Sequence, residues 1–301
     1  MSKHYIFSDT HHGSDNVVRF LKKEAHGEKI SVSSTGDFPV YEARAGGPRA
    51  LRHPYTDAYR KDDKDALKKH EAGWIKKVVV PKTAQSGKKL QELKPYLEGG
   101  RVNAIMGNSD YGVGGMARKY SGSGTRELLG GEKSAVKHIS DVRVRREGNT
   151  TFVYMPHHER IASKYKKSDY ASAREALQKD KGYQDQLEGI AAKVNKYNSD
   201  NIVVMMHEAP APDRWYGKGS AKSKSRLPDG LKAHYNSVLE AILAKNSGKK
   251  VDIFHGHLHE AKKKEYEYKV GGQNVQTHLL DIGDVVAYDT DSGKYRRRRA
   301  A

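Results

Sequence analysis

Cysteine is absent from this sequence of 301 residues. Without thiols the chain cannot form disulfides, cysteine-ligated zinc sites, iron–sulfur clusters or a thiol nucleophile. Any metal ion must therefore be held by histidine, aspartate, asparagine or glutamate side chains. The absence narrows the metal chemistry open to the chain to nitrogen and oxygen ligands.

Long apolar segments are also missing. No run approaches the ~20 residues that span a bilayer, and the N-terminus passes from Met1 directly into a short apolar strand before Asp9. We therefore expect a soluble, cytoplasmic protein without a membrane partner. The length allows one large α/β domain or two small ones, and 36% hydrophobic residues suffice for a sizeable core.

Acidic residues are scarce relative to basic ones. Asp and Glu number 37 against 55 Lys and Arg, which gives a formal charge of +18. Such a field raises the concentration of polyanions near the surface and fits phosphate-bearing partners. A solvated, lysine-rich surface that keeps the protein soluble explains the same charge equally well.

Several short apolar runs end abruptly in Asp, His, Asn or Gly residues. The runs are Tyr5–Phe7, Ile30–Val32, Val102–Met106, Ile202–Met206 and Val251–Phe254. Each is typical of a buried strand whose carboxyl end delivers a reactive side chain. Open α/β sheets collect their ligands at this end of the strands, so the polar residues that follow are the first candidates for a site.

Helical periodicity lies between these strands. Apolar residues recur at helical spacing in 183–194 and 231–243, which predicts two amphipathic helices that cover a sheet. A hairpin is predicted for Val142–Arg146 and Thr151–Met155, and the alternation in Thr277–Tyr288 predicts strands of a second sheet layer.

Two segments have the composition of insertions. They are residues 40–100, with helices expected near 61–80 and 87–97, and the Lys- and Ala-rich helical segment 159–200. Neither has a linker-like boundary, so we expect a single domain over 1–301 that ends in a basic tail at 296–301.

Histidine and carboxylate pairs after these runs have the spacing of metal ligands. His257 and His259 are alternate residues of an extended segment, so their imidazoles can converge on one centre or on two neighbouring ones. Asp9 and His11 have the same spacing, although such a pair alone could be a turn beside a surface imidazole. The full set is Asp9, His11, Asp37, Asn108, His207, His257 and His259. These hard or borderline ligands suit Mn²⁺, Zn²⁺ or Fe rather than a calcium cage.

The same pieces, in the same order, resemble the signature of the calcineurin-like metallophosphoesterase superfamily, which runs Asp-x-His, Gly-Asp, Gly-Asn-His-Asp, His and Gly-His-x-His. They stand here as Asp9-Thr10-His11, Gly36-Asp37, Gly107-Asn108-Ser109-Asp110, His207 and Gly256-His257-Leu258-His259. The resemblance spans residues 4 to about 290, apart from the two insertions. It implies the family's α/β fold, a four-layer αββα sandwich with the site on loops at one edge of the paired sheets.

Carried over residue by residue, the resemblance implies two divalent metal ions. Asp9, His11 and His259 would hold one ion, Asn108, His207 and His257 would hold the other, and Asp37 would bridge them. The first choice of metal is Mn²⁺, with Zn²⁺, Fe or Ni²⁺ as alternatives. Two cations ~3.5–4 Å apart lower the pKa of a bridging water and stabilise charge on the attacking and leaving oxygens. The implied function is a binuclear metal-dependent phosphoesterase that works through a metal-activated hydroxide.

Ser109 departs from the family pattern, in which a histidine follows the asparagine and assists the leaving oxygen. A serine hydroxyl does not ionise near neutral pH, and losing a positioned general acid costs about 10²–10⁴-fold in rate. Family members with another residue at this position tend toward phosphodiesters. We therefore expect a phosphodiesterase that acts on a nucleotide or nucleic-acid phosphodiester. Three histidines are candidates for a substitute acid, with surface or supporting roles more common for each: His12, His157 and His158.

The remaining site residues follow from the same pattern. The catalytic set is Asp9, His11, Asp37, Asn108, Ser109, Asp110 and His207, in which Asp110 would orient its neighbours. Substrate contacts are expected from Asn108 and from Lys218 and Arg226, the ends of a basic loop without periodicity. Weaker candidates for phosphate contacts are Tyr111, Arg49 and Arg52, although an ordinary exposed side chain is the favoured interpretation of each.

Other functions stay open at this level. A phosphomonoesterase would share every ligand, and a non-catalytic binding module on the same scaffold would explain Ser109 but not a full set of seven ligands. The Arg296–Arg299 run could grip nucleic-acid phosphates, but a solvated tail explains it as well. Nothing in the sequence indicates an oligomeric state.

Overall fold

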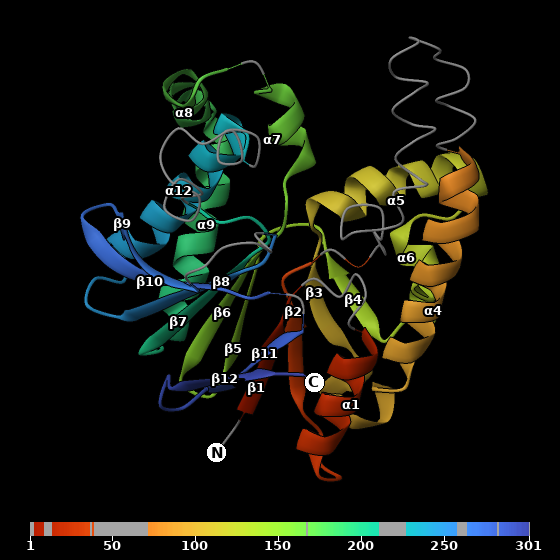
Figure 1. The fold of residues 1–301 in the computed structure, drawn as a ribbon. Coiled ribbons are helices and arrows are strands. Elements are labelled where there is room, and N and C mark those ends of the chain that lie inside the picture. The colour runs from red at the N-terminus through yellow and green to blue at the C-terminus, as the bar shows by residue number, and fades with distance from the viewer. Residues whose placement is uncertain are drawn as a thin grey trace.

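The computed structural model describes residues 3–8, 14–36, 38, 72–166, 168–210, 227–257, 264–281 and 283–300. Within these ranges, the side chains at positions 108, 109, 112–114, 116 and 159 are not described. The described part forms two six-stranded β-sheets that face one another, with helices on both outer sides (Figure 1).

The first sheet has the strand order β12-β11-β1-β2-β3-β4. Its strands are β1 (Lys3–Phe7), β2 (Ser31–Ser34), β3 (Val102–Ile105), β4 (Val136–Ile139), β11 (Asp284–Asp289) and β12 (Tyr295–Arg299). Strands β1 to β4 run parallel, whereas β11 is antiparallel to β1 and β12 is antiparallel to β11. Parallel strands bring their carboxyl ends to the same edge of a sheet.

The second sheet has the order β5-β6-β7-β8-β10-β9. Its strands are β5 (Arg143–Glu147), β6 (Thr150–Met155), β7 (Asn201–Met206), β8 (Lys250–His255), β9 (Glu265–Val270) and β10 (Gln273–Leu279). Strands β6, β7, β8 and β10 are parallel, and the edge strands β5 and β9 are antiparallel to their neighbours. Met206 is in register with Met155 and His255, so β6, β7 and β8 end at the same level.

Helices cover the outer face of each sheet (Figure 1). Beside the first sheet lie α1 (Ser14–Ala25), α4 (Val80–Gln91), α5 (Asn108–Ser121) and α6 (Thr125–Leu128). Beside the second lie α7 (Glu159–Lys164), α8 (Tyr170–Lys179), α9 (Lys181–Tyr197) and α12 (Asp229–Ala244). A π-helical turn, Ile75–Val79, precedes α4, and 3₁₀ turns occupy Lys94–Tyr96, Glu98–Gly100 and Gly131–Lys133.

The alternation of side chains along the strands produces four layers. In β7, Val203 and Met205 belong to the apolar cluster between the sheets, whereas Ile202 and Val204 belong to the cluster under α9 and α12. In β1, Tyr5 and Phe7 pack toward α1. Because successive side chains of a strand point to opposite faces, each sheet buries both of its faces. The fold is therefore the four-layer αββα sandwich that the sequence led us to expect.

Most elements agree with the sequence. All five apolar runs are strands, the hairpin forms as β5 and β6, and the two predicted amphipathic helices are α9 and α12. The segment 159–200 is helical, as expected. One boundary is wrong: instead of a break near 81–86, residues 72–91 form one continuous helical segment. Pro81 lies just after the π-helical turn Ile75–Val79, so the residue without an N–H falls where the backbone hydrogen-bond pattern changes from the π-helical to the α-helical one.

The C-terminal strands are arranged differently from the expectation. We expected Thr277–Tyr288 to build a second sheet layer, but only β10 joins the second sheet, whereas β11 returns to the first sheet beside β1. The arginines expected in a solvated tail form β12, an edge strand paired with β11. Within the described ranges, none of the helices has the length and apolar character required to cross a membrane.

Candidate metal centre

The carboxyl ends of β1 and β2 are joined by hydrogen bonds. The backbone N–H of Thr35, just after β2, donates to the carbonyl of Phe7 at 3.0 Å. The Thr35 hydroxyl donates to the hydroxyl of Ser8 at 2.9 Å. Ser8 directly precedes Asp9, and Gly36 directly precedes Asp37. The described residues therefore bring the positions before two predicted ligands next to one another.

The end of β3 approaches the same point through two glycines. Gly36 has a φ of +110°, and a Cβ on it would lie 2.9 Å from the backbone nitrogen of Gly107 and 3.0 Å from Nδ1 of His207. Real Cβ atoms essentially never come this close. Glycine at position 36 is thus required both by its backbone angle and by the space around it.

Two hydrogen bonds tie the ends of the first sheet to those of the second. Nδ1 of His207, after β7, lies 2.9 Å from the carbonyl oxygen of Thr35. The N–H of His157, after β6, donates to the carbonyl of Met106 at 2.8 Å. Strand ends from both sheets therefore meet at one place, which is where the sequence pattern predicted a site.

The contact with Thr35 fixes the protonation of the His207 ring. His207 is fully buried, and a carbonyl oxygen can only accept a hydrogen bond, so Nδ1 carries the proton. In the neutral ring the lone pair then lies on Nε2, the nitrogen that can bind a metal. A carbonyl partner that orients the ring in this way is the usual support of a metal-bound histidine.

His257 faces His207 from the end of β8. The two ring centroids are 5.1 Å apart at an interplanar angle of 65°. The N–H of Gly256 donates to the carbonyl of His207 at 3.1 Å, which links the ends of β7 and β8. His257 has a φ of +68°, a left-handed conformation that non-glycine residues rarely adopt. Such strain persists where the surrounding structure enforces it, often at functional sites.

The buried carboxylate of Asp110 holds two of the ligand-bearing turns. It accepts from the N–H of Gly107 at 2.9 Å and from the N–H of Phe38 at 3.3 Å. Gly107 precedes Asn108, and Phe38 follows Asp37. Through these two hydrogen bonds Asp110 acts as a positioning residue for the turns that carry Asp37 and Asn108.

Glu208 is a second buried carboxylate, and it was not among the site residues expected from the sequence. Its Oε1 lies 2.5 Å from Nδ1 of His157, and its Oε2 accepts from the Tyr235 hydroxyl at 2.6 Å. Burial raises the pKa of Glu208, but the His157 ring and the nearby rings of His207 and His257 outweigh it and hold that pKa well below its usual range. Glu208 is therefore ionised, and it orients His157 through Nδ1.

The two other candidate acids differ from His157. Nδ1 of His158 accepts from the N–H of Ile161 at 3.4 Å and so begins α7, while its ring packs edge-on against His234 at 5.2 Å. Burial lowers the pKa of His158. His12 lies outside the described residues. Of the two that are described, His157 is the one placed at the strand ends beside a carboxylate.

The remaining predicted site residues can be placed only by their neighbours. Outside the described ranges are Asp9, His11, Asp37, His259, Lys218, Arg226, Arg49 and Arg52. The side chains of Asn108 and Ser109 are not described, although both lie at the start of α5. In the part of the chain that is described, no group of three or more His, Asp or Glu side chains could hold a metal ion. The described part of the site has two facing imidazoles, His207 and His257, and the tautomer of His207 is fixed. These nitrogen donors fit a divalent cation.

Comparisons with known proteins show a distant likeness. No protein-family model and no curated protein matches the chain. Among solved structures, it is similar to the sulfate thiohydrolase SoxB of Thermus thermophilus in complex with glycerol, with 10% sequence identity and a TM-score of 0.37. The match covers 99% of this chain and 56% of SoxB, so the chain spans about half the length of that protein. At this level the likeness says nothing about what the chain binds or does.

Proposed function

We propose that the chain is a metal-dependent phosphoesterase with a binuclear centre at the strand ends, and that its substrates are phosphodiesters. The observation that carries the proposal is the buried His207 ring, whose Nε2 lone pair is fixed by Thr35 and which faces His257. Histidines held in this way after neighbouring parallel strands are typical of metal ligands rather than of core packing.

The ligand assignment follows the sequence pattern. His207 and His257 would hold one ion together with Asn108, and Asp9, His11 and His259 would hold the other, with Asp37 between them. The cations, when bound, would polarise the phosphoryl group and offset charge on the attacking and leaving oxygens. Mn²⁺ is the first choice because the set combines imidazoles with carboxylate and amide oxygens.

His157 is the described residue that can hold a proton at the edge of this centre. Because ionised Glu208 accepts from Nδ1, a proton on Nε2 of His157 is directed away from that carboxylate. The negative charge on Glu208 also favours the protonated ring. His157 can therefore donate a hydrogen bond to a phosphoryl or leaving oxygen, a role that Ser109 fills poorly.

The experiment compares two buried histidines. His207→Leu removes a proposed ligand, whereas His278→Leu removes a fully buried histidine whose Nε2 bonds to Asp252 at 2.9 Å inside the sandwich. Each purified protein is dialysed against Mn²⁺ and its metal content is measured by mass spectrometry. Turnover of bis(p-nitrophenyl) phosphate and p-nitrophenyl phosphate is then recorded.

The unmodified chain and His278→Leu should retain bound Mn²⁺ and hydrolyse the diester faster than the monoester. His207→Leu should lose metal and activity while remaining folded by circular dichroism. A faster reaction with the monoester would make the chain a phosphomonoesterase. Full metal binding by His207→Leu would contradict the ligand assignment, and bound metal without turnover of either ester would favour a non-catalytic module.

A further inference from the structure

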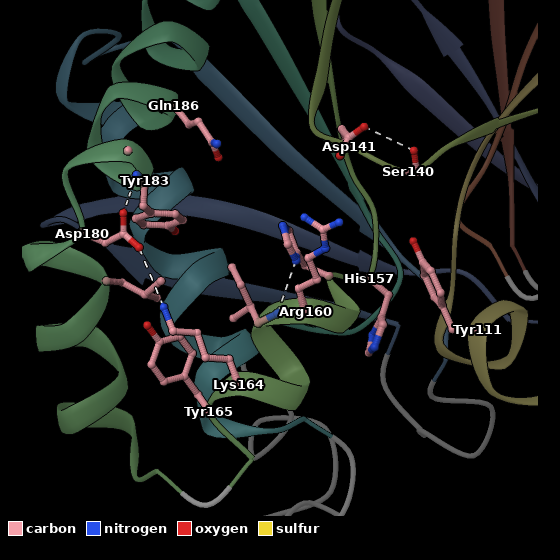
Figure 2. Close-up of a pocket in the computed structure, with 14 residues that line it drawn as sticks. Tyr111, Ser140, Asp141, His157, Arg160, Lys164, Tyr165, Asp180, Tyr183 and Gln186 are labelled. Carbon is pink, nitrogen blue, oxygen red and sulfur yellow. Dashed lines mark hydrogen bonds and ion pairs between the residues drawn. The ribbon is translucent and has the colours of Figure 1, made fainter. Parts of the chain in front are cut away.

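A cavity of about 600 Å³ opens beside the strand ends, between α7, α9 and the turn that joins β4 to β5 (Figure 2). His157 and Tyr111, whose rings are 5.7 Å apart, form the wall nearest the candidate metal centre. His157 connects the two places because its partner Glu208 directly follows His207. Cavities of ~300–1,000 Å³ enclose ligands of about nucleotide size.

Arg160 lines this cavity and has no ion-pair partner among the described residues. Its guanidinium makes no hydrogen bond and no ion pair with any residue that the structure describes. Lys164 differs, because its ammonium lies 3.9 Å from the carboxylate of Asp180 and 5.1 Å from the centre of the Tyr165 ring. A guanidinium with its donors unused is suited to bind a phosphate with two parallel hydrogen bonds.

Figure 2 shows the place of Arg160 among the residues that line the cavity. In that view Arg160 stands between His157 on the side of the candidate centre and Gln186 of α9 on the far side. A ligand that carries two phosphates could place one at the candidate metal centre and the other on Arg160. Nucleotide chains and nucleoside bisphosphates carry two phosphates, whereas a simple monoester carries one.

The cavity also offers groups that can contact the body of such a ligand. Asp141, whose carboxylate accepts from the Ser140 hydroxyl at 3.3 Å, lies across from the side-chain amide of Gln186. Carboxylate and amide groups on opposite walls can bond to sugar hydroxyls and base edges. The Tyr111 ring beside His157 supplies an aromatic surface, and every nucleobase has a face that can stack on one.

We infer that this cavity binds the nucleotide portion of a diester substrate, with Arg160 on a phosphate other than the one that is cleaved. The inference rests on the proposed function, because it names the substrate class of that same site. This cavity is a different place from the basic loop at 218–226, because Arg160 and His157 line it together.

Two chromogenic esters test the inference by turnover. The first is the 5′-(p-nitrophenyl) ester of thymidine 5′-phosphate, and the second carries an additional 3′-phosphate. The unmodified chain should have a KM for the second ester that is lower by about 10- to 100-fold, the range expected for a hydrogen-bonded charge pair. Arg160→Gln should bring the KM values of the two esters together.

The matched control is Lys166→Gln, which makes the same change of charge at an exposed position that does not line the cavity. It should preserve the preference for the 3′-phosphate. Equal KM values for the two esters in the unmodified chain would overturn the inference while leaving the proposed function intact. An equal loss of the preference in both variants would assign it to general charge and overturn the inference as well.

A binding measurement keeps the two proposals distinguishable. Thymidine 3′,5′-bisphosphate and thymidine are titrated calorimetrically into each protein in the presence of a chelator, so no reaction is required. Arg160→Gln should weaken binding of the bisphosphate by about 10- to 100-fold relative to Lys166→Gln. If no ester is hydrolysed but this difference appears, the nucleotide site stands and the phosphoesterase proposal fails. If the bisphosphate binds all three proteins equally, the nucleotide site fails.

Discussion

Buried pairs of a histidine and a carboxylate occur in two different regions of this molecule. Two pairs lie in the layer between the sheets and one lies at the strand ends. The pairs are His4–Glu147 at 2.7 Å, His278–Asp252 at 2.9 Å and His157–Glu208 at 2.5 Å. Their chemistry is alike, but the third pair lines the cavity described above through His157 and lies beside a candidate metal ligand, since Glu208 follows His207 in the chain.

Position along the strand explains the difference. His4 stands inside β1, where Nδ1 bonds to Glu147 and Nε2 lies 2.8 Å from the Ser33 hydroxyl, so both ring nitrogens have partners in the core. His157 follows the last residue of β6, beyond the last rung of the sheet. A histidine–carboxylate pair inside a strand thus serves packing. A pair beyond the end of a strand can instead orient the imidazole toward a ligand.

The strongest way to break the strand-end region is to fill the space at Gly36. Gly36→Ala places a Cβ 3.0 Å from Nδ1 of His207 and 2.9 Å from the backbone of Gly107. Because backbone cannot give way cheaply, the ends of β2, β3 and β7 should separate, and we expect loss of metal binding and of activity. Mn²⁺ content and turnover of an aryl diester measure the effect.

Gly27→Ala is the matched control for this change. Gly27 also has a positive φ, +85°, but a Cβ there would meet nothing within 4 Å. Both variants carry the backbone penalty of a left-handed alanine, about 1 kcal/mol, so that penalty cancels in the comparison. Retention of metal by Gly36→Ala, at the level of Gly27→Ala, would show that close contact of these strand ends is not needed for the site.

Much of the fold could be predicted from the sequence because the central strands are apolar on both faces. β7 is buried at every position, and its sequence, Asn201–Met206, is almost entirely aliphatic. The edge strand β12 could not be predicted in this way. β12 is Tyr295–Arg299, with four successive arginines, and its strand conformation depends on pairing with β11 rather than on a local apolar pattern.

Some residues of the candidate site could be predicted from the local sequence, and others could not. His207 and His257 could be singled out because each follows a buried strand, a signal within a few residues of sequence. The pairing of His157 with Glu208 could not, because it joins residues 51 positions apart and exists only because β6 and β7 are neighbours in the sheet. One local sign was available: Glu208 follows the buried strand β7 by two residues, and a carboxylate that is buried there needs a partner.

The second prediction exchanges the carboxylates of the two regions for amides. Glu147→Gln should lower the free energy of unfolding by about 1–3 kcal/mol, because its hydrogen bonds to His4 and Ser31 lose their charge. It should leave turnover per folded molecule unchanged. Glu208→Gln should also destabilise the fold, but in addition it should lower kcat, because a neutral amide no longer favours a proton on His157.

Denaturant unfolding and steady-state kinetics on both variants separate these effects. The pH profile of kcat gives the sharper readout, since Glu208→Gln should shift its upper limb to lower pH and Glu147→Gln should leave it in place. If the pH profile of kcat in Glu208→Gln matched that of the unmodified chain, the carboxylate of Glu208 would serve packing, as that of Glu147 does. The two regions would then not differ in function.

The smallest expected effect concerns His234, a buried histidine that contacts a tyrosine instead of a carboxylate. The Tyr183 hydroxyl lies 2.8 Å from its Nδ1, and burial, with the positive charge on protonated His158, lowers the pKa of His234 from 6.5 to about 3. Because the folded state then binds fewer protons than the unfolded state below pH 6.5, stability is lost as the pH falls through this range. Between pH 7.5 and 5.0 this one group should lower the free energy of unfolding by about 2 kcal/mol.

His234→Phe should abolish that part of the pH dependence. Tyr183→Phe deletes the same hydrogen bond but retains the titrating ring, so it should keep that part of the pH dependence. Urea unfolding of the three proteins at both pH values, with chelator present, measures the difference. If the free energy of unfolding changed with pH equally in His234→Phe and Tyr183→Phe, His234 would take up its proton in the folded state, as a histidine with a carboxylate partner can.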